Sequence, residues 1–182
     1  RQFTPSQLMS MANSLPARFS PGEGWGYSNS NYVILGCVLE KVYHQPFATL
    51  VSDLLIQKHV ANTYYLTHPY PATILQRMVR GYYQRIDSTD INGSWLQSAG
   101  ALVSTPASIA RWYATLFNAH TGKPYFSYPF YSTKTGKVSS QLSPAGYQMG
   151  IFRMNTPSGM LYFTPGLTSG YVSLAFYSPC LG

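Results

Sequence analysis

The sequence predicts an α+β protein in which a helical region lies beside an antiparallel sheet. In the first two-thirds of the chain, apolar residues recur at intervals of three and four, which is helical spacing. The last third instead contains short apolar and aromatic runs separated by Gly- and Pro-containing turns. Helices and strands segregated in this way are typical of α+β folds. We therefore expect a helical region over residues 1–120 and antiparallel strands over residues 121–182.

The composition allows a sizeable core and excludes several classes of function. The chain has 182 residues, of which 45% are hydrophobic and only 9% are charged. The net charge of +7 arises because there are only five carboxylates, and the Lys and Arg residues form no run or stripe. We therefore expect no nucleic-acid partner. No apolar run reaches the roughly 18 residues of a membrane span, so we expect no transmembrane segment in this chain.

The histidines and cysteines do not form a recognisable metal or disulfide pattern. The four histidines lack the spacing of metal ligands, and we expect neither a metal nor a cofactor. The two cysteines are too few for a disulfide framework. Cys37 lies among Val33, Ile34 and Val38 at helical spacing, so we expect a buried thiol.

Four helices are predicted, each with a local start signal. Thr4 caps the first helix, which has Pro5 in its first turn and extends to Ser14. The second extends from about residue 30 to 43, with Asn29 or Ser30 as its cap. Pro46 and Pro106 begin the other two, and the last ends near residue 118.

The remaining segments are predicted as loops and strands. Residues 80–85 are a short extended piece, and residues 121–144 are loop with short strands. Three antiparallel strands are then expected over residues 147–154, 160–163 and 171–177, with a turn over residues 155–159.

A Gly/Pro-rich loop carries the residues that are candidates for chemistry. Residues 21–26 contain one proline and three glycines, which restrict the path of the backbone. The loop leads to Tyr27 and Asn29, which precede an apolar helix. A phenol and a carboxamide held two residues apart suit catalysis, although Tyr27 could serve only in packing and Asn29 only as a helix cap.

Four motifs in order resemble those of the serine β-lactamase-like superfamily, which includes class C β-lactamases, D-alanyl-D-alanine carboxypeptidases and related esterases. They are P-G-x-x-W-x-Y-S-N-x-N-Y-x-x-L-G from Pro21, A-G-x-L-x-S-T-P-x-x-x-A-R-W from Ala99, Y-x-M-G from Tyr147, and the final G-x-x-x-G-Y-x-S. The resemblance implies a β-lactamase/transpeptidase-like fold. Because the chain lacks an initiator Met and stops directly after a strand-like run, we interpret both ends as cuts. The chain would then be one incomplete domain without the first strands and the last helix.

The resemblance implies roles for several residues. Tyr27 would relay the proton between a nucleophilic serine and the leaving group, and Asn29 would bind the substrate amide. Thr164, Gly166 and Leu167 would line the opposite wall of the site, with the Leu167 N–H serving an oxyanion hole. Here Thr164 replaces a cationic or imidazole side chain, and Pro165 replaces a hydroxyl residue.

The literal Lys134-Thr135-Gly136 is the alternative wall motif. It precedes Tyr147-Gln148-Met149-Gly150, whereas the superfamily places the triplet after that segment. We therefore prefer Thr164 and treat Lys134 as a surface residue.

The superfamily's Ser-x-x-Lys nucleophile motif does not occur, since no Ser is followed three residues later by Lys. We expect the nucleophile in a missing N-terminal segment of the same protein, so that this chain alone is inactive. The whole protein would be a periplasmic or secreted serine hydrolase that acts on a β-lactam, a D-Ala-D-Ala peptide or an ester through an acyl-enzyme. The alternative is a catalytically inactive binding or scaffold homologue.

Overall fold

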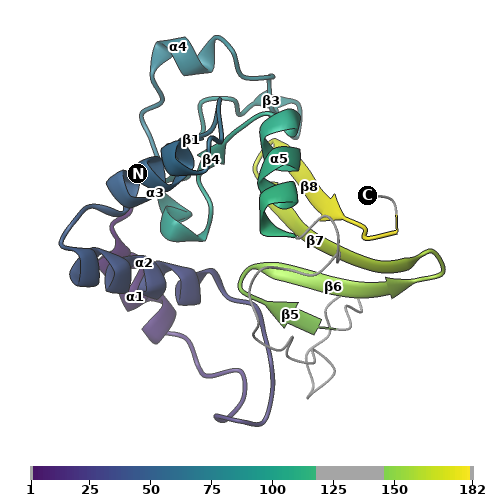
Figure 1. Cartoon of the computed structure of the whole chain (residues 1–182). Coiled ribbons are helices and arrows are strands. Elements are labelled where there is room, and N and C mark those ends of the chain that lie inside the picture. Colours follow the sequence, from purple (N-terminus) through teal and green to yellow (C-terminus); the bar gives the residue numbers. More distant parts are fainter. Residues whose placement is uncertain (1, 118–145, 181–182) are drawn as a thin grey trace. The chain divides into compact units, whose positions relative to one another are not determined.

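The structure, a computed structural model, describes residues 2–117 and 146–180 (Figure 1). Lys134-Thr135-Gly136 therefore lies outside the described residues. The first part of the chain contains α1 (Pro5–Asn13), α2 (Asn29–Tyr43), α3 (Phe47–Gln57), β1 (Tyr64–Tyr65), α4 (Ala72–Leu75), β2 (Tyr82–Tyr83), β3 (Ile86–Asp87), the 3₁₀ turns η1 (Gly93–Trp95) and η2 (Gln97–Ala99), β4 (Leu102–Val103) and α5 (Pro106–Leu116). The second part contains β5 (Gly146–Gln148), β6 (Ile151–Thr156), β7 (Gly159–Thr168) and β8 (Tyr171–Tyr177).

The α+β class predicted from the sequence is confirmed: the helices precede an antiparallel sheet. The chain folds as two compact units. Unit 1 comprises residues 1–16, 28–105 and 166–172, and unit 2 comprises residues 17–27, 106–165 and 173–182. Both units combine segments that are distant in sequence. The division at residue 120 inferred from the sequence stays a prediction.

The helices of unit 1 begin close to the residues that the sequence indicates. The predicted cap of α1 is confirmed, because the Thr4 hydroxyl accepts the Gln7 N–H while the Gln7 side chain accepts the Thr4 N–H. The predicted cap of α2 is wrong by one residue. Ser28, not Asn29 or Ser30, is the cap, and its hydroxyl accepts the Ser30 N–H at 3.2 Å.

Helix α2 buries a different face from the one predicted. Val33 is only 2% exposed and Gly36 is also buried, whereas Ile34 and Val38 are 44% and 48% exposed. The prediction of a buried Cys37 is wrong, because this thiol is exposed. Apolar residues surround most of the helix, so their spacing alone did not decide which face is buried.

Helix α3 is capped from the neighbouring helix. Its first residue, Phe47, follows Pro46, as the sequence predicts, but no side chain at Pro46 can cap the helix. Instead the carboxylate of Glu40 on α2 accepts the Phe47 N–H at 2.8 Å. A negative charge at a helix N-terminus is favourable, so this bond joins α2 to α3.

Unit 2 contains a four-stranded antiparallel sheet in the order β5-β6-β7-β8, and the β7–β8 hairpin tip belongs to unit 1. The predicted single strand over 147–154 is wrong, because Met149 and Gly150 form a two-residue turn between β5 and β6. Both residues have positive φ, 46° and 86°, as required by a type I′ hairpin turn. Strand β7 is longer than predicted, and it includes residues 164–168.

Helix α5 covers one face of this sheet (Figure 1). Tyr113 and Phe117 are 6% and 1% exposed, and they pack with Ile151 of β6. Around this cluster lie six partly buried residues: Ile109, Trp112, Leu116, Tyr162, Ala175 and Tyr177. Because neighbours along a strand alternate between faces, Phe163 and Phe176 point to the opposite face.

Candidate active site

Tyr27 is held against the face of the sheet that α5 does not cover. Its ring lies 6.1 Å from that of Tyr147 in an edge-on arrangement, and the Trp25 ring lies 5.3 Å from the same tyrosine. Tyr147 is paired across the strands with Phe152, which is paired with Phe163, so these rings share one face. The loop 17–27 thus rests on a row of aromatic side chains, and Tyr27 remains 43% exposed.

Partial burial raises the pKa of the Tyr27 hydroxyl above its ordinary value. An ordinary tyrosine titrates near about 10, so the phenol is protonated at neutral pH in this environment. A general base at neutral pH needs the opposite shift, which nearby positive charges can supply. The surroundings described here therefore favour the protonated form of Tyr27.

Asn29 is the first residue of α2. Ser28 between the two candidate residues is extended, with φ −145° and ψ 130°, and its cap hydrogen bond fixes this conformation at the start of the helix. The Asn29 side chain is not needed as the cap, so the capping alternative for Asn29 is wrong. The Asn29 carboxamide therefore does not act as the cap of α2.

Thr164 lies on the opposite face of the sheet from Tyr27. The Tyr113 hydroxyl donates to Thr164 Oγ1 at 2.6 Å, and Thr164 Oγ1 donates to the Gly150 carbonyl at 2.9 Å. Burial raises the pKa of Tyr113, and the hydrogen bond to Thr164 opposes this effect. The Thr164 hydroxyl thus joins α5, β7 and the β5–β6 turn, and the structure does not bring this side chain together with Tyr27.

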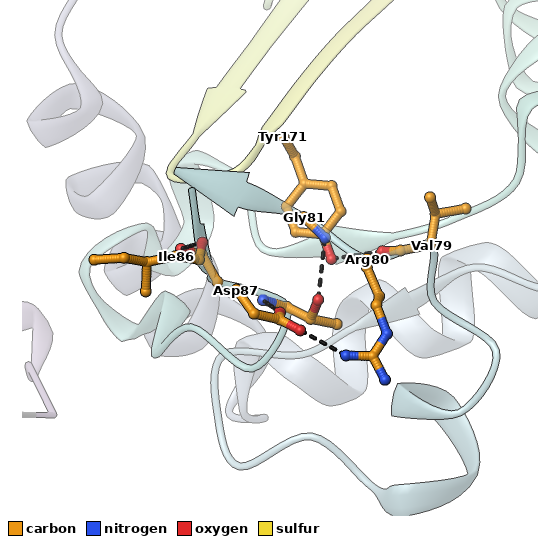
Figure 2. A network of polar contacts seen from close by, with 8 residues as sticks. Val79, Arg80, Gly81, Ile86, Asp87 and Tyr171 are labelled. Carbon is orange, nitrogen blue, oxygen red and sulfur yellow. Dashed lines mark hydrogen bonds and ion pairs between the residues drawn. The ribbon is translucent and has the colours of Figure 1, made fainter. Parts of the chain in front are cut away.

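Gly166 and Leu167 lie near the end of β7, in the part of the hairpin that belongs to unit 1. The Leu167 side chain is 76% exposed, so any contribution to a site would come from its backbone. Figure 2 shows how this tip is fixed: the Tyr171 hydroxyl donates to the Val79 carbonyl at 2.8 Å, next to Gly81.

Close packing in this region requires glycine at two positions. A Cβ on Gly81 would lie 2.5 Å from the Tyr171 ring and 3.0 Å from the Gly170 carbonyl. Gly170 has φ +92°, in the region that favours glycine, and a Cβ there would lie 3.0 Å from the Gly81 carbonyl carbon. Gly170, the second glycine of the final motif, thus allows the tip of the β7–β8 hairpin to approach the loop that carries Gly81.

Polar contacts join Arg80 and Gly81 to the segment 87–89 (Figure 2). The Gly81 N–H donates to Thr89 Oγ1 at 3.0 Å, and Arg80 pairs with Asp87 at 2.7 Å. Hydrogen bonds from Thr89, followed by the Arg80 contact, hold the pKa of Asp87 below its usual range. This ion pair is exposed, so we assign it a minor role in stability.

Two motifs that are far apart in sequence meet within unit 1. The Ser98 hydroxyl donates to the Tyr32 carbonyl at 2.7 Å, which joins η2 to α2. A Cβ on Gly36 would lie 2.6 Å from the Ser98 Cβ, so the last glycine of the first motif makes room for the turn that begins the second. Tyr32 and Gly36 of the first motif therefore pack against Ser98, which directly precedes the second motif.

The described residues contain no cluster of three or more His, Cys, Asp or Glu side chains suited to a metal ion. A depression of about 420 Å³ is lined by consecutive residues of one loop, Asp87–Ile91, and it includes none of the predicted site residues.

Among the helices of the described segments, none is both long enough and apolar enough to cross a membrane.

Sequence reasoning selected Tyr27 and Asn29 as candidates through their motif, but it did not reveal two other features of the structure. The Tyr113–Thr164 bond joins residues 51 positions apart, and the Tyr171–Val79 bond joins residues 92 positions apart. Neither pair has a local signal. The only hint is the glycine at position 170, which permits the close approach of Tyr171.

The structure thus combines helices with an antiparallel sheet, and Tyr27 lies directly before the cap of α2. The sequence model of the family described as Beta-lactamase matches residues 1–182, and the chain belongs to this family.

Sequence relatives are distant. The chain is 28% identical over 89 residues to a protein of Escherichia coli strain K12 that is provisionally named D-alanyl-D-alanine carboxypeptidase. The aligned part covers 48% of this chain and 18% of that protein. The chain thus spans only a small part of this relative, and the alignment supports a distant common origin.

Solved structures share the fold over nearly all of this chain. A D-stereospecific amidohydrolase from Streptomyces sp. superposes with a TM-score of 0.77 at 23% identity, covering 98% of this chain and 54% of that one. The D-amino acid amidase from Ochrobactrum anthropi SV3 gives a TM-score of 0.76 at 21% identity, covering 94% and 52%. A further structure of that amidase contains L-phenylalanine amide. The chain therefore spans about half the length of these enzymes.

Proposed function

We propose that the whole protein is a serine hydrolase that acts through an acyl-enzyme, and that this chain supplies the proton-transfer residue and part of the substrate site. The single observation that carries the proposal is the anchoring of Tyr27. Its ring lies on Tyr147, and Ser28 fixes the backbone between it and Asn29. A catalytic group must be held in one geometry, and these contacts supply that constraint.

Tyr27 would accept the proton of the attacking serine and later return it to the leaving group. Burial alone raises the pKa of Tyr27, so this role requires cations from the rest of the protein. The lysine of a Ser-x-x-Lys motif outside this chain would supply one such charge. Asn29 would donate its amide N–H to the carbonyl of the substrate's acyl side chain.

Thr164, Gly166 and Leu167 would contribute backbone rather than side chains to the substrate site. The Thr164 hydroxyl is already bound to Tyr113 and to the Gly150 carbonyl. Thr164 and Gly166 would therefore contact the substrate through their backbone, and the Leu167 N–H would stabilise the oxyanion. A substrate carboxylate would find no cationic partner at position 164, which favours substrates without a free carboxylate there.

The test uses the full-length protein expressed from its complete coding sequence. We expect a covalent mass increase with at least one of four probes: a fluorescent penicillin, a D-Ala-D-Ala peptide, D-phenylalanine amide or an activated ester. The substitution Tyr27→Phe should slow acylation by about 10²–10⁴-fold, as expected when a general base is lost. The control is Tyr83→Phe, at an exposed position of β2.

Two outcomes would contradict the proposal in different ways. An unchanged acylation rate in Tyr27→Phe would remove Tyr27 from the mechanism. No adduct with any probe, in a protein with an intact Ser-x-x-Lys motif, would favour the second candidate, a catalytically inactive binding homologue. The observation in favour of that candidate is that the Thr164 hydroxyl is already hydrogen-bonded to Tyr113.

A periplasmic or secreted location is part of the proposal, and cell fractionation tests it.

A further inference from the structure

Tyr171, the first residue of β8, joins the tip of the β7–β8 hairpin to a segment that is distant in the sequence. We call residues 166–172 the hairpin tip, since they are the part of the hairpin that belongs to unit 1. The Tyr171 hydroxyl donates to the Val79 carbonyl at 2.8 Å, across 92 positions of sequence (Figure 2). This bond connects the tip to the segment 79–89, which contains β2 and β3.

Gly170 lies against the backbone of the same segment. A Cβ at position 170 would lie 3.1 Å from the Tyr82 nitrogen and 3.2 Å from the Ser88 Cβ. A Cβ on Gly81 would lie 2.5 Å from the Tyr171 ring. The tip and the segment are therefore closely packed around the hydrogen bond, and the Tyr171 ring has little room to move while the tip keeps this position.

The segment 79–89 is a firm attachment point, because internal hydrogen bonds hold its own backbone. The Ser88 N–H donates to the Gly81 carbonyl at 2.8 Å, and the Gly81 N–H donates to Thr89 Oγ1 at 3.0 Å. The Thr89 N–H donates to Asp87 Oδ1 at 2.9 Å, and β2 pairs with β3. A tip that is bonded to such a segment moves less than one that is bonded to an unsupported loop.

The position of Leu167 depends on this attachment for two reasons. The Leu167 and Val172 side chains are 76% and 83% exposed, so their packing contributes little to holding the tip. The turn between β7 and β8 has only two residues, Ser169 and Gly170. Because so short a turn cannot absorb a movement, a displacement of Tyr171 also displaces the end of β7, where Leu167 lies.

We propose that Tyr171 is a positioning residue, whose hydroxyl holds the hairpin tip so that the Leu167 N–H keeps the direction needed to stabilise an oxyanion. The inference rests on the proposed function, in which the Leu167 N–H is such a donor. Oxyanion donors act through geometry, since they must point at the place where negative charge develops. Tyr171 acts through Leu167 and need not touch the substrate.

The test compares Tyr171→Phe with the unchanged full-length protein. This substitution keeps the ring against Gly81 and removes only the hydroxyl. The first measurement is the acylation rate with an activated ester and with its thionoester, in which sulfur replaces the carbonyl oxygen. Sulfur is a weak hydrogen-bond acceptor, so the oxygen ester benefits far more from a well-placed N–H. We expect the oxygen ester to acylate about 10-fold more slowly at saturating concentration, with unchanged substrate binding, and the thionoester to change much less.

The second measurement requires no activity. It is amide hydrogen exchange of residues 166–172 in the full-length protein, followed by mass spectrometry. Loss of the hydrogen bond should make the hairpin tip exchange about 3–10-fold faster, while exchange in β6 stays the same. The matched control for both measurements is Tyr83→Phe, which removes a hydroxyl from a tyrosine that is 54% exposed.

Three results would overturn the inference. They are exchange of the tip no faster than in the Tyr83→Phe control, an unchanged acylation rate with the oxygen ester, and an equal slowing with both esters. The last result would mean that fewer molecules are folded, because a displaced donor affects the oxygen ester selectively. Absence of any adduct in the unchanged protein would instead contradict the proposed function, and the exchange measurement would still decide whether Tyr171 holds the tip.

Discussion

The Thr164 hydroxyl joins three parts of unit 2 through two hydrogen bonds, one from Tyr113 and one to the Gly150 carbonyl. Because it both accepts and donates, its removal leaves two partly buried groups without this partner. Removal of the Tyr113 hydroxyl removes only the hydrogen bond that Thr164 accepts, and the bond to the Gly150 carbonyl remains. Loss of the Thr164 hydroxyl should therefore destabilise the protein more than loss of the Tyr113 hydroxyl.

We expect Thr164→Val to lower the free energy of unfolding by about 1–3 kcal/mol and Tyr113→Phe by only about 0.5–1.5 kcal/mol. The measurement is urea unfolding of the full-length protein, followed by circular dichroism. Thr164→Ser keeps the hydroxyl and serves as the control. A larger loss in Tyr113→Phe than in Thr164→Val would contradict this reading of the two bonds.

The raised pKa values of four tyrosines determine how the free energy of unfolding should depend on pH. Burial is the main cause that raises the pKa of Tyr27, Tyr65, Tyr70 and Tyr113 above the ordinary value. An unfolded tyrosine ionises near about 10, so the unfolded state loses these protons first as the pH rises. The stability is therefore fully present below about pH 10, and it decreases above that value as the pH approaches the raised pKa values.

We expect the free energy of unfolding of the full-length protein to decrease steadily as the pH rises above about 10. Urea unfolding at a series of pH values measures this decrease, and Tyr113→Phe should make it less steep. The comparison is with Tyr83→Phe at an exposed position. A stability that stays constant or increases over the same range would show that burial of these phenols is not the dominant effect.

At the scale of elements, the packing of α2 on η2 depends on Gly36. The space that a side chain at position 36 would occupy is already filled by Ser98, whose hydroxyl is bonded to the Tyr32 carbonyl. Cores and tight contacts tolerate added atoms poorly, because neighbouring backbones must then move apart. The helix that carries Asn29 is thus positioned by the absence of one side chain.

Gly36→Ala should lower the free energy of unfolding by about 1–3 kcal/mol, in spite of the better helix propensity of alanine. A double-mutant cycle with Ser98→Gly checks the cause, because removal of the Ser98 side chain makes room for the new methyl group. Chemical unfolding of the four proteins gives the coupling. Purely additive effects would mean that the two positions do not compete for the same space.

The same elements show what the sequence could and could not predict. Local signals placed the starts of α1, α3 and α5, since Thr4, Pro5, Pro46 and Pro106 act within one turn of the helix. They failed at α2, where three adjacent residues could all cap, and at the β5–β6 turn. Gly150 occupies the second position of that turn, but the first position, which is usually Asn, Asp or Gly, is Met149 with φ 46°.

At the scale of the whole molecule, each unit combines segments that are distant in sequence, and unit 1 includes residues 166–172 from the end of the sheet. Tyr27 could be proposed as a candidate from the sequence because its motif is contiguous. The engagement of Thr164 could not, because its partner Tyr113 lies on a helix 51 positions earlier. Long-range pairs of this kind are specified by packing, which a single sequence does not display.

The two cysteines, both exposed, have a practical consequence. Cys37 belongs to unit 1 and Cys180 to unit 2, so the natural sequence already carries one attachment point for a probe in each unit. Spin labels or a fluorophore pair attached at these thiols would report the separation of the units in solution without any added cysteine. The same pair of labels would report whether that separation changes when a substrate analogue binds.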